Sequence, residues 1–424
     1  MSRPKNRHNH LLGRLVHRLG PGLITGAADD DPSGIATYAQ AGAAFGYALG
    51  WSVVLTLPFM VAVQEISARI GRVTGAGLGA ALRRHTPRPL LFLLIGLLVL
   101  ANLINLGADI GAMADAARLV LGGPPEAWAI ATALFCAATE IWISYRRYAI
   151  LLKWMTLALI AYVALLLVIR LPLGAVLIGV FVPRVSLTPA ALTTLLAVLG
   201  TTISPYLFFW QAAEEVEEEE IAPDPRPLRE HEADAPAEIS RIGFDTWAGM
   251  AYSNCVALCI IVGTAATLHV RGVETINTAA DAAAALIPIA GRFASLVFAL
   301  GIFGTGLLAV PVLAGSSAYA LGEASGWRVG LGRRALEARA FYATIGGATL
   351  LGTLIIFSPL NPMRALFWSA VINGVVAVPM IVAMVLLGGS RDVMGTLTLP
   401  AWLRVFGWGT AILMGFASAG LFFP

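Results

Sequence analysis

The sequence predicts an all-α polytopic membrane protein. Of its 424 residues, 58% are hydrophobic and only 12% are charged, about half the charged share of a typical soluble domain. Apolar stretches recur in lengths of about 20 residues, which is what a helix needs to cross a bilayer. Clusters of Gly and Pro separate them, as turns do. A net charge of +3 gives no case for binding nucleic acid.

Windows of this length predict eleven spans in a single transport domain, residues 20–424, after a basic tail at residues 1–19. The tail lacks the short apolar core and small-residue cleavage site of a secretory signal, so we expect a retained cytoplasmic segment. The expected spans are residues 21–45, 47–70, 89–120, 126–145, 149–172, 190–213, 243–268, 288–322, 338–358, 364–388 and 400–422.

The Lys and Arg residues predict the orientation of these spans. With the N-terminus in the cytoplasm, 22 of the 28 basic residues fall on the cytoplasmic side. We therefore expect an integral protein of a bacterial inner (plasma) membrane, with its C-terminus outside. This orientation also places an acidic loop, residues 214–240, in the cytoplasm. We expect it to be flexible and solvated; the alternative is that it gathers cations at the inner mouth.

The first span carries three consecutive acids, Asp29 to Asp31, followed by Pro32 and Gly34. A charge at the bilayer centre costs about 2.5–3.5 kcal/mol on insertion scales, and Pro and Gly favour unwinding. Unwound backbone at membrane depth survives only where it lines a cavity or is buried in protein. The sequence therefore predicts a broken helix at a functional site. The alternative is a loop at the membrane edge, with the span starting at Ile35.

The sixth span contains a second break, Thr201 to Tyr206, centred on Pro205. Proline removes a helical hydrogen bond and frees carbonyls near Thr201; alternatively, the helix only kinks and Ser204 bonds back to its own helix. Breaks at matching positions of two halves indicate a transport site between inverted repeats. We expect a first repeat at residues 20–172 and an inverted second repeat at residues 190–388. An additional helix is expected at residues 400–422.

Several segments resemble the Nramp metal-ion transporter family. They are Gly20–Leu23, Asp31-Pro32, Ala44–Tyr47, Gln64–Gly75 and Asp109-Ile110, with a weaker likeness at Gly315–Glu323. The resemblance implies a LeuT-type fold of five plus five helices, with the first and sixth discontinuous. It also implies coupled uptake of a divalent metal ion, which is cargo, so no cofactor is expected.

The sequence departs from the family pattern at the residues that would contact the metal. The family's metal-binding Asn falls at Gly34, its methionine at Ser204, its histidine at Tyr206, and its acidic residue in span three at Ala112. A thioether favours transition metals, whereas oxygen donors suit Mg²⁺, which keeps several of its waters. The departures resemble the magnesium-transporting branch of the family and favour Mg²⁺, with Mn²⁺ second.

The candidate residues come from the two breaks and from polar positions in spans three and ten. The candidate metal ligands are Ala28, Asp31, Gly34, Thr201, Ser204 and Asn373. The candidates for a cation-attracting vestibule or for coupling are Asp29, Asp30, Asp109 and Tyr206.

Proton coupling is doubtful, because all six His fall in tails, loops or span ends and none can relay protons in mid-membrane. The leading hypothesis is secondary uptake of divalent cations by alternating access, by a monomer whose partners are the metal ion and the bilayer. Alternatives are a proton-coupled Mn²⁺/Fe²⁺ symporter, a symporter of an organic solute, and a metal sensor without flux. An intramembrane enzyme is disfavoured, because no HExxH or GxSxG motif occurs in any span.

Overall fold

The computed structural model describes residues 20–142, 160–184, 186–222, 225–357 and 361–421. Within these residues the regular elements are helices, and none is a strand. The first half contains α2 (Pro21–Asp29), α3 (Pro32–Phe45), α4 (Gly50–Thr74), α5 (Leu78–His85), α6 (Arg88–Leu121), α7 (Pro125–Trp142), α9 (Ile160–Val168) and α10 (Leu173–Phe181). The second half contains α11 (Pro189–Thr202), α12 (Pro205–Glu220), α13 (Ala235–Thr267), α14 (Ala279–Ala283), α15 (Ile287–Ala290), α16 (Ala294–Ser325), α17 (Arg339–Ile356), α18 (Pro362–Gly389), α19 (Arg391–Met394) and α20 (Ala401–Ala419).

Helices at the predicted spans form the bundle. Among the described residues, six helical stretches are long and apolar enough to cross a membrane: Pro32–Thr74, Arg88–Leu121, Pro189–Glu220, Glu232–Arg271, Gly291–Ser325 and Pro362–Gly389. Helices α7, α17 and α20 occupy three further predicted spans. The predicted fifth span, 149–172, lies partly outside the described residues, and α9 covers its last part.

Several helices begin at a cap residue followed by proline. The side chains of Asp31, Thr188 and Asn361 each accept a main-chain N–H of the first turn, and proline is the first helical residue in each case. Proline fits there because the first N–H groups of a helix have no partner within the helix. The Asp31-Pro32, Thr188-Pro189 and Asn361-Pro362 steps are therefore helix starts, whereas Pro58, Pro311 and Pro379 lie inside helices.

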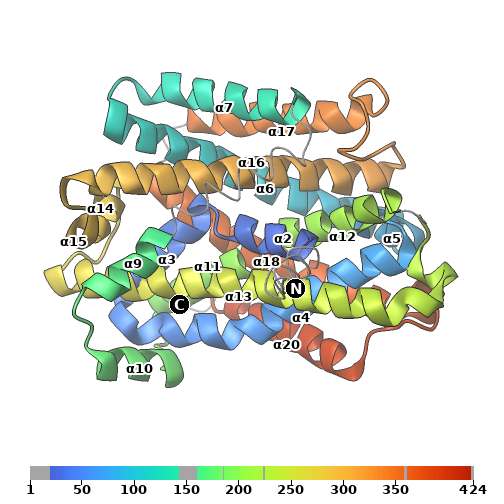
Figure 1. Ribbon diagram of the computed structural model, residues 1–424, viewed down its shortest axis with the longest axis horizontal. Coiled ribbons are helices and arrows are strands. Elements are labelled where there is room, and N and C mark those ends of the chain that lie inside the picture. The colour runs from blue at the N-terminus through green and yellow to red at the C-terminus, as the bar shows by residue number, and fades with distance from the viewer. Residues whose placement is uncertain (1–19, 143–159, 185, 223–224, 358–360, 422–424) are drawn as a thin grey trace, which may run out of the picture.

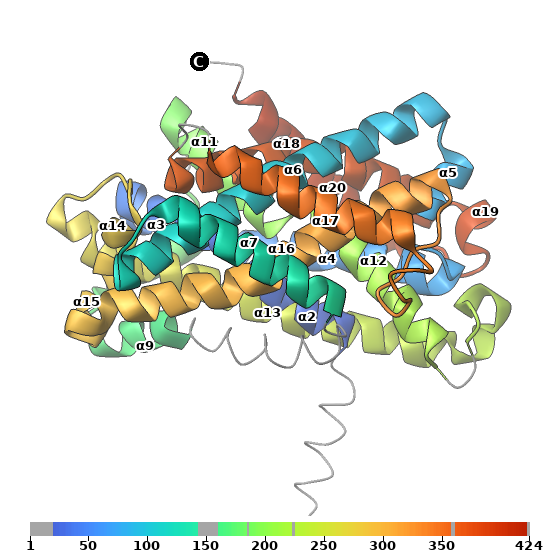
Figure 2. The same ribbon diagram turned by 90° about the horizontal axis from the view of Figure 1, so that it is seen from above.

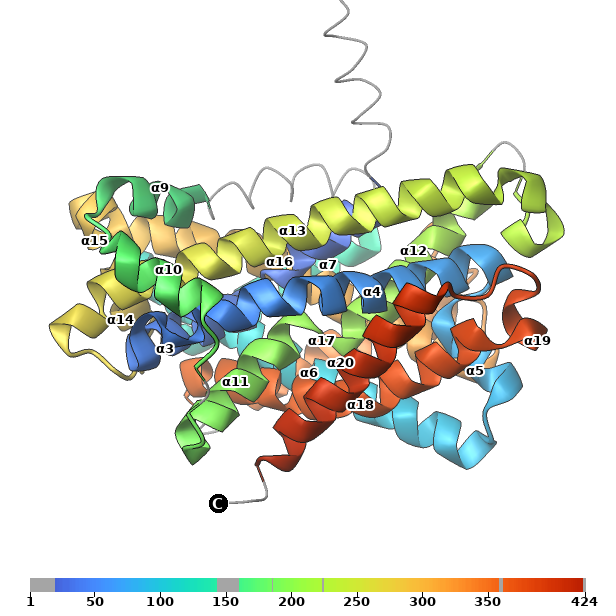
Figure 3. The same ribbon diagram turned by 90° about the horizontal axis from the view of Figure 1, so that it is seen from below.

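The two broken helices lie in the middle of the bundle (Figure 1). Helices α2 and α3 both pack on α13, and α3 also contacts α11 and α18. Helix α16 packs along α6, and α7 lies beside α17 (Figure 2). On the opposite side, α20 covers α4 and α18 (Figure 3). The breaks are therefore enclosed by helices from both halves of the chain.

Glycines let α2 approach α13 closely. A Cβ on Gly26 would lie 2.3 Å from the main chain of Gly249, and a Cβ on Gly22 would lie 2.7 Å from the main-chain nitrogen of Thr246. Small residues four apart allow this backbone-to-backbone contact between membrane helices. A larger side chain at Gly26 would push α2 away from α13.

The expectation of a flexible acidic loop at residues 214–240 is wrong for much of its length. Residues 214–220 form the last turns of α12, and α13 begins at Ala235. Short 3₁₀ turns occupy 228–230 and 232–234. Glu214, Glu215 and Glu219 are buried. Glutamate is a good helix former, and arginines from neighbouring helices neutralise part of this charge.

Candidate cation site

The two helix breaks meet in space. The first lies at Asp30 and Asp31, between α2 and α3, and the second lies at 203–204, between α11 and α12. The Tyr206 hydroxyl, one residue into α12, donates to the carbonyl oxygen of Ala28 over 3.1 Å. A Cβ on Gly34 would lie 3.3 Å from Oγ1 of Thr201. Four residues predicted for the site are thus brought together from both breaks.

Asp31 is the most heavily hydrogen-bonded of these residues. Its Oδ1 accepts from the Ser33 hydroxyl over 2.6 Å and from the main-chain N–H of Gly34 over 2.7 Å. Its Oδ2 accepts from the Asn105 amide over 3.0 Å and from the Tyr206 hydroxyl over 3.4 Å. The side chain is buried. Four donors hold the carboxylate in place, and a bound cation would replace some of them.

Asn105 in α6 is a partner of Asp31 that the sequence did not single out. Its own Oδ1 accepts from the Ser369 hydroxyl of α18 over 2.7 Å. A chain of hydrogen bonds therefore joins α3, α6 and α18. The available signal was an amide in the long apolar run of the third span, where a polar side chain needs a partner.

Asp29 and Asp30 point away from this network, toward α13. The Ser253 hydroxyl lies 2.5 Å from Oδ2 of Asp29 and 3.2 Å from Oδ1 of Asp30. Both aspartates are fully buried, and α2 continues up to Asp29, which contradicts a solvent-exposed loop at this position. In the described part of the chain, no group of three or more His, Cys, Asp or Glu is arranged to hold a metal ion. The three consecutive acids therefore do not form one carboxylate cage.

At the second break, the hydroxyl of Ser204 is turned back onto its own helix. It lies 2.8 Å from the carbonyl oxygen of Gly200 and 2.9 Å from that of Thr201. The bond of Ser204 back to its own helix is the one expected if the helix only kinked. The helix does not only kink, however, because the break separates α11 from α12. The hydroxyl oxygen keeps lone pairs for a cation, because it acts only as a donor in these contacts.

Asp109 and Asn373 are buried, and the side-chain amide of Asn373 has no hydrogen-bond partner among the described residues. Asp109 follows Asn105 by four residues on α6, and Asn373 follows Ser369 by four on α18. Residues four apart lie on one helix face, so both belong to the faces that carry the Asp31 network. Unpaired buried polar groups are costly, which favours a role with water or a cation.

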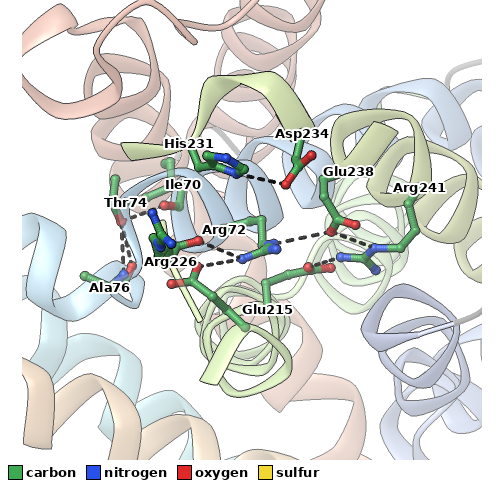
Figure 4. Close-up of polar contacts among 11 residues, drawn as sticks. Ile70, Arg72, Thr74, Ala76, Glu215, Arg226, His231, Asp234, Glu238 and Arg241 are labelled. Atoms are coloured by element: carbon green, nitrogen blue, oxygen red, sulfur yellow. Dashed lines mark hydrogen bonds and ion pairs between the residues drawn. The ribbon is translucent and has the colours of Figure 1, made fainter. Parts of the chain in front are cut away.

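Ion pairs between charged side chains join the ends of α4, α12 and α13 (Figure 4). Arg241 contacts Glu215 over 2.5 Å and Glu238 over 3.1 Å. Arg72 contacts the same Glu238 oxygen over 3.3 Å and Glu219 over 2.8 Å. We call these five residues the ionic cluster. It explains why the acidic segment is ordered: its carboxylates alternate with arginines from two other helices.

Asp245, one turn beyond Arg241 on α13, caps the start of α2. Its carboxylate accepts from the main-chain N–H groups of Gly20, Gly22 and Leu23 over 2.9, 2.6 and 3.1 Å. A negative charge at a helix N-terminus is stabilising, because the first N–H groups are unpaired and the helix dipole is positive there. Helix α2, the first half of the first span, is thus anchored to α13.

Comparison with known proteins agrees with this arrangement. Residues 22–424 match the family described as natural resistance-associated macrophage protein-like, or Nramp. The chain belongs to the Nramp family. This Nramp protein is 25% identical to the divalent metal cation transporter MntH of Deinococcus radiodurans, over 95% of this chain and 88% of that one. It is 29% identical to MntH of Chromohalobacter salexigens, over 72% and 68%.

Solved structures share the fold of this Nramp protein. The Eremococcus coleocola manganese transporter, in complex with an aromatic bis-isothiourea substituted compound, has a TM-score of 0.74 at 18% identity, over 99% of this chain and 88% of that one. Mhp1, a nucleobase-cation-symport-1 family transporter, has a TM-score of 0.57 at 16% identity, over 95% and 92%. The predicted family and the LeuT-type fold with discontinuous first and sixth helices are confirmed.

Proposed function

We propose that this Nramp-family protein carries divalent metal cations across a membrane by alternating access, with Asp31 at the centre of the site. The observation that carries the proposal is the meeting of two helix breaks at one buried, multiply hydrogen-bonded carboxylate. Broken helices at the bilayer midplane expose main-chain oxygens to a transported ion. Relatives named as divalent metal cation transporters support the same substrate class.

The site favours hard ions, Mg²⁺ first and Mn²⁺ second. Asp31, Ser204, Asn373 and the main chain at Ala28 and Thr201 provide oxygen donors. The position where the family carries a thioether is Ser204, so the soft ligand that favours transition metals is missing. Mg²⁺ binds through few carboxylates and keeps several waters, which matches a single central Asp beside the small residue Gly34.

We propose that transport does not depend on proton coupling. The three His in the described residues lie away from the site: His85 is on α5, His231 contacts Asp234, and His269 contacts the Ala43 carbonyl. A proton-coupled Mn²⁺/Fe²⁺ symporter is the second candidate, because Asp109 is a buried acid on the same helix face as Asn105.

We further propose a bacterial inner-membrane location, with the N-terminus in the cytoplasm and the C-terminus outside. The contacts support the grouping of the segments on two sides, since segments predicted to share a side touch each other, and the distribution of Lys and Arg supports the choice of the cytoplasmic side. The ionic cluster joins the expected cytoplasmic ends of α4, α12 and α13. At the other end, Gln40 hydrogen-bonds the Glu274 carbonyl and the Ile276 N–H, and Asn361 bonds the Asn277 carbonyl.

Uptake into proteoliposomes tests these proposals, with Mg²⁺, Mn²⁺ and Ca²⁺ supplied outside and internal pH recorded. We expect Mg²⁺ uptake, Mn²⁺ uptake that excess Mg²⁺ inhibits, and no metal-driven change in pH. Mn²⁺ uptake that excess Mg²⁺ does not inhibit would contradict the proposal of a site for hard ions. A metal-driven acidification would support the proton-coupled symporter, and metal binding without uptake would indicate a sensor.

A further inference from the structure

A groove of about 710 Å³ lies between α6 and α18, away from the cation site. Leu90 and Leu94 of α6 form one wall, and Val382 and Leu386 of α18 form the other. Leu90 is 47% exposed and Leu386 is 59% exposed. At membrane depth, exposed leucines face acyl chains, so lipid can enter this groove from the side.

One end of the groove is polar and basic. His85, Thr86 and Ser390 line it there and provide a ring N–H and two hydroxyls. Three exposed arginines flank these lining residues in the sequence: Arg84, Arg88 and Arg391. Asp392 follows Arg391 in the sequence, and the carboxylate of Glu323 lies at the start of α5, so two acids face this group. The groove is therefore apolar along its length and positively charged at one end.

This basic end is held in place by specific contacts. Glu323 of α16 accepts from the main-chain N–H groups of Gly79 and Ala80, over 2.9 and 3.2 Å, and so fixes the start of α5. On the other wall, the N–H of Leu399 donates to the Gly388 carbonyl over 3.0 Å. Figure 3 shows α5 and α19 at the same end of the molecule, beside α6 and α18.

We propose that this groove binds an anionic phospholipid. An acyl chain lies along α6 and α18, and the phosphate meets His85, Ser390 and the three arginines. A free anion would leave the apolar length of the groove without a ligand. The ammonium group of a zwitterionic lipid would be repelled by the three arginines. Each basic residue near the membrane surface strengthens binding of anionic lipid by about fivefold.

The lipid would act on transport through α18. Pro379 lines the groove, and it leaves the carbonyl one turn earlier without its helical partner, so α18 can bend there. Ser369 and Asn373 lie on the N-terminal side of Pro379 in the same helix, and Ser369 donates to Asn105 of the Asp31 network. A lipid seated against the bend favours one shape of α18, whichever divalent ion is carried.

The test measures how tightly the purified full-length protein in detergent binds palmitoyl-oleoyl phosphatidylglycerol, using native mass spectrometry and thermal shift. The test variant is Arg84→Gln/Arg88→Gln/Arg391→Gln. The matched control, Arg229→Gln/Arg328→Gln/Arg334→Gln, removes three exposed charges elsewhere. We expect wild type and control to bind the lipid equally and the test variant to bind at least about tenfold more weakly.

A second variant, Ala383→Trp, fills the groove and leaves every charge in place. We expect it to lose phosphatidylglycerol while keeping the thermal midpoint of the lipid-free protein, so the result does not depend on folding of the triple variant. Wild-type binding in Ala383→Trp would overturn the proposal. Equal binding of palmitoyl-oleoyl phosphatidylcholine, or equal stabilisation by inorganic phosphate, would overturn it too.

Discussion

The side-chain amide of Asn105 donates to Oδ2 of Asp31 over 3.0 Å and so ties the third span to the first helix break. We expect Asn105→Leu to weaken metal uptake by about ten- to a hundredfold, because a hydrogen bond to a charged group contributes about 1.5–3 kcal/mol. Asp31→Ala should abolish uptake. Metal-dependent uptake into proteoliposomes measures both.

Asn102→Leu is the matched control for this prediction. Asn102 lies one turn before Asn105 on α6, but it donates to the hydroxyls of Ser316 and Ser317 on α16. Its loss should lower the thermal midpoint while the KM for the metal stays near the wild-type value. Wild-type uptake in Asp31→Ala would remove Asp31 from the site.

Residue 204 provides a test of metal preference. We expect Ser204→Met to raise affinity for Cd²⁺ and Mn²⁺ relative to Mg²⁺, because it adds a soft thioether at the second break. Ser204→Ala removes the hydroxyl without adding sulfur and is the control. It should weaken the binding of all these ions to a similar degree. Competition between Cd²⁺ and Mg²⁺ for binding gives the ratio. An unchanged ratio in Ser204→Met would show that residue 204 does not contact the ion.

The helix breaks could be predicted from the sequence because their signals are local. Proline after Asp31 and after Ser204, within apolar runs, permits few structures at membrane depth. The partners of the aspartates were not predictable in this way. Asn105 and Ser253 are single polar residues in apolar helices, and only the packing of distant helices decides what they contact.

The prediction of a flexible acidic segment is wrong for a related reason. A run of glutamates typically indicates a solvated chain, and Glu215 shows how the fold overrides this pattern. Its neutralising partner, Arg241, comes from α13, and the next arginine of the ionic cluster, Arg72, comes from α4. Charge balance across three helices is a property of the fold, which a count of charges along one segment does not reveal.

The Glu215–Arg241 pair should contribute strongly to stability. Arg241→Met leaves Glu215, whose side chain is 0% exposed, buried without its cation. Removing one partner of a buried pair costs about 3–5 kcal/mol, whereas replacing both with apolar residues is often neutral. We therefore expect a lower thermal midpoint in Arg241→Met and recovery in Glu215→Met/Arg241→Met. Equal loss in the single and double variants would contradict this account.

Asp245 should control how firmly α2 stays against α13. Asp245→Ala removes a charged cap of three N–H groups, a loss of about 1–2 kcal/mol, so separation of α2 should become about tenfold more frequent. Thr25, which is 0% exposed on α2, offers a reporter. In a Cys255→Ser background, Thr25→Cys should react about tenfold faster with a thiol reagent when Asp245 is Ala.

The control for the α2 experiment is Asp281→Ala. Asp281 also caps a helix, since its carboxylate accepts from the main-chain N–H groups of Asn277 and Thr278 at α14. It is far along the chain from α2 and should leave the labelling rate of Thr25→Cys unchanged. If both substitutions speed labelling equally, general loosening of the bundle explains the effect. Acceleration by Asp245→Ala alone assigns to Asp245 the anchoring of α2, the first half of the first span.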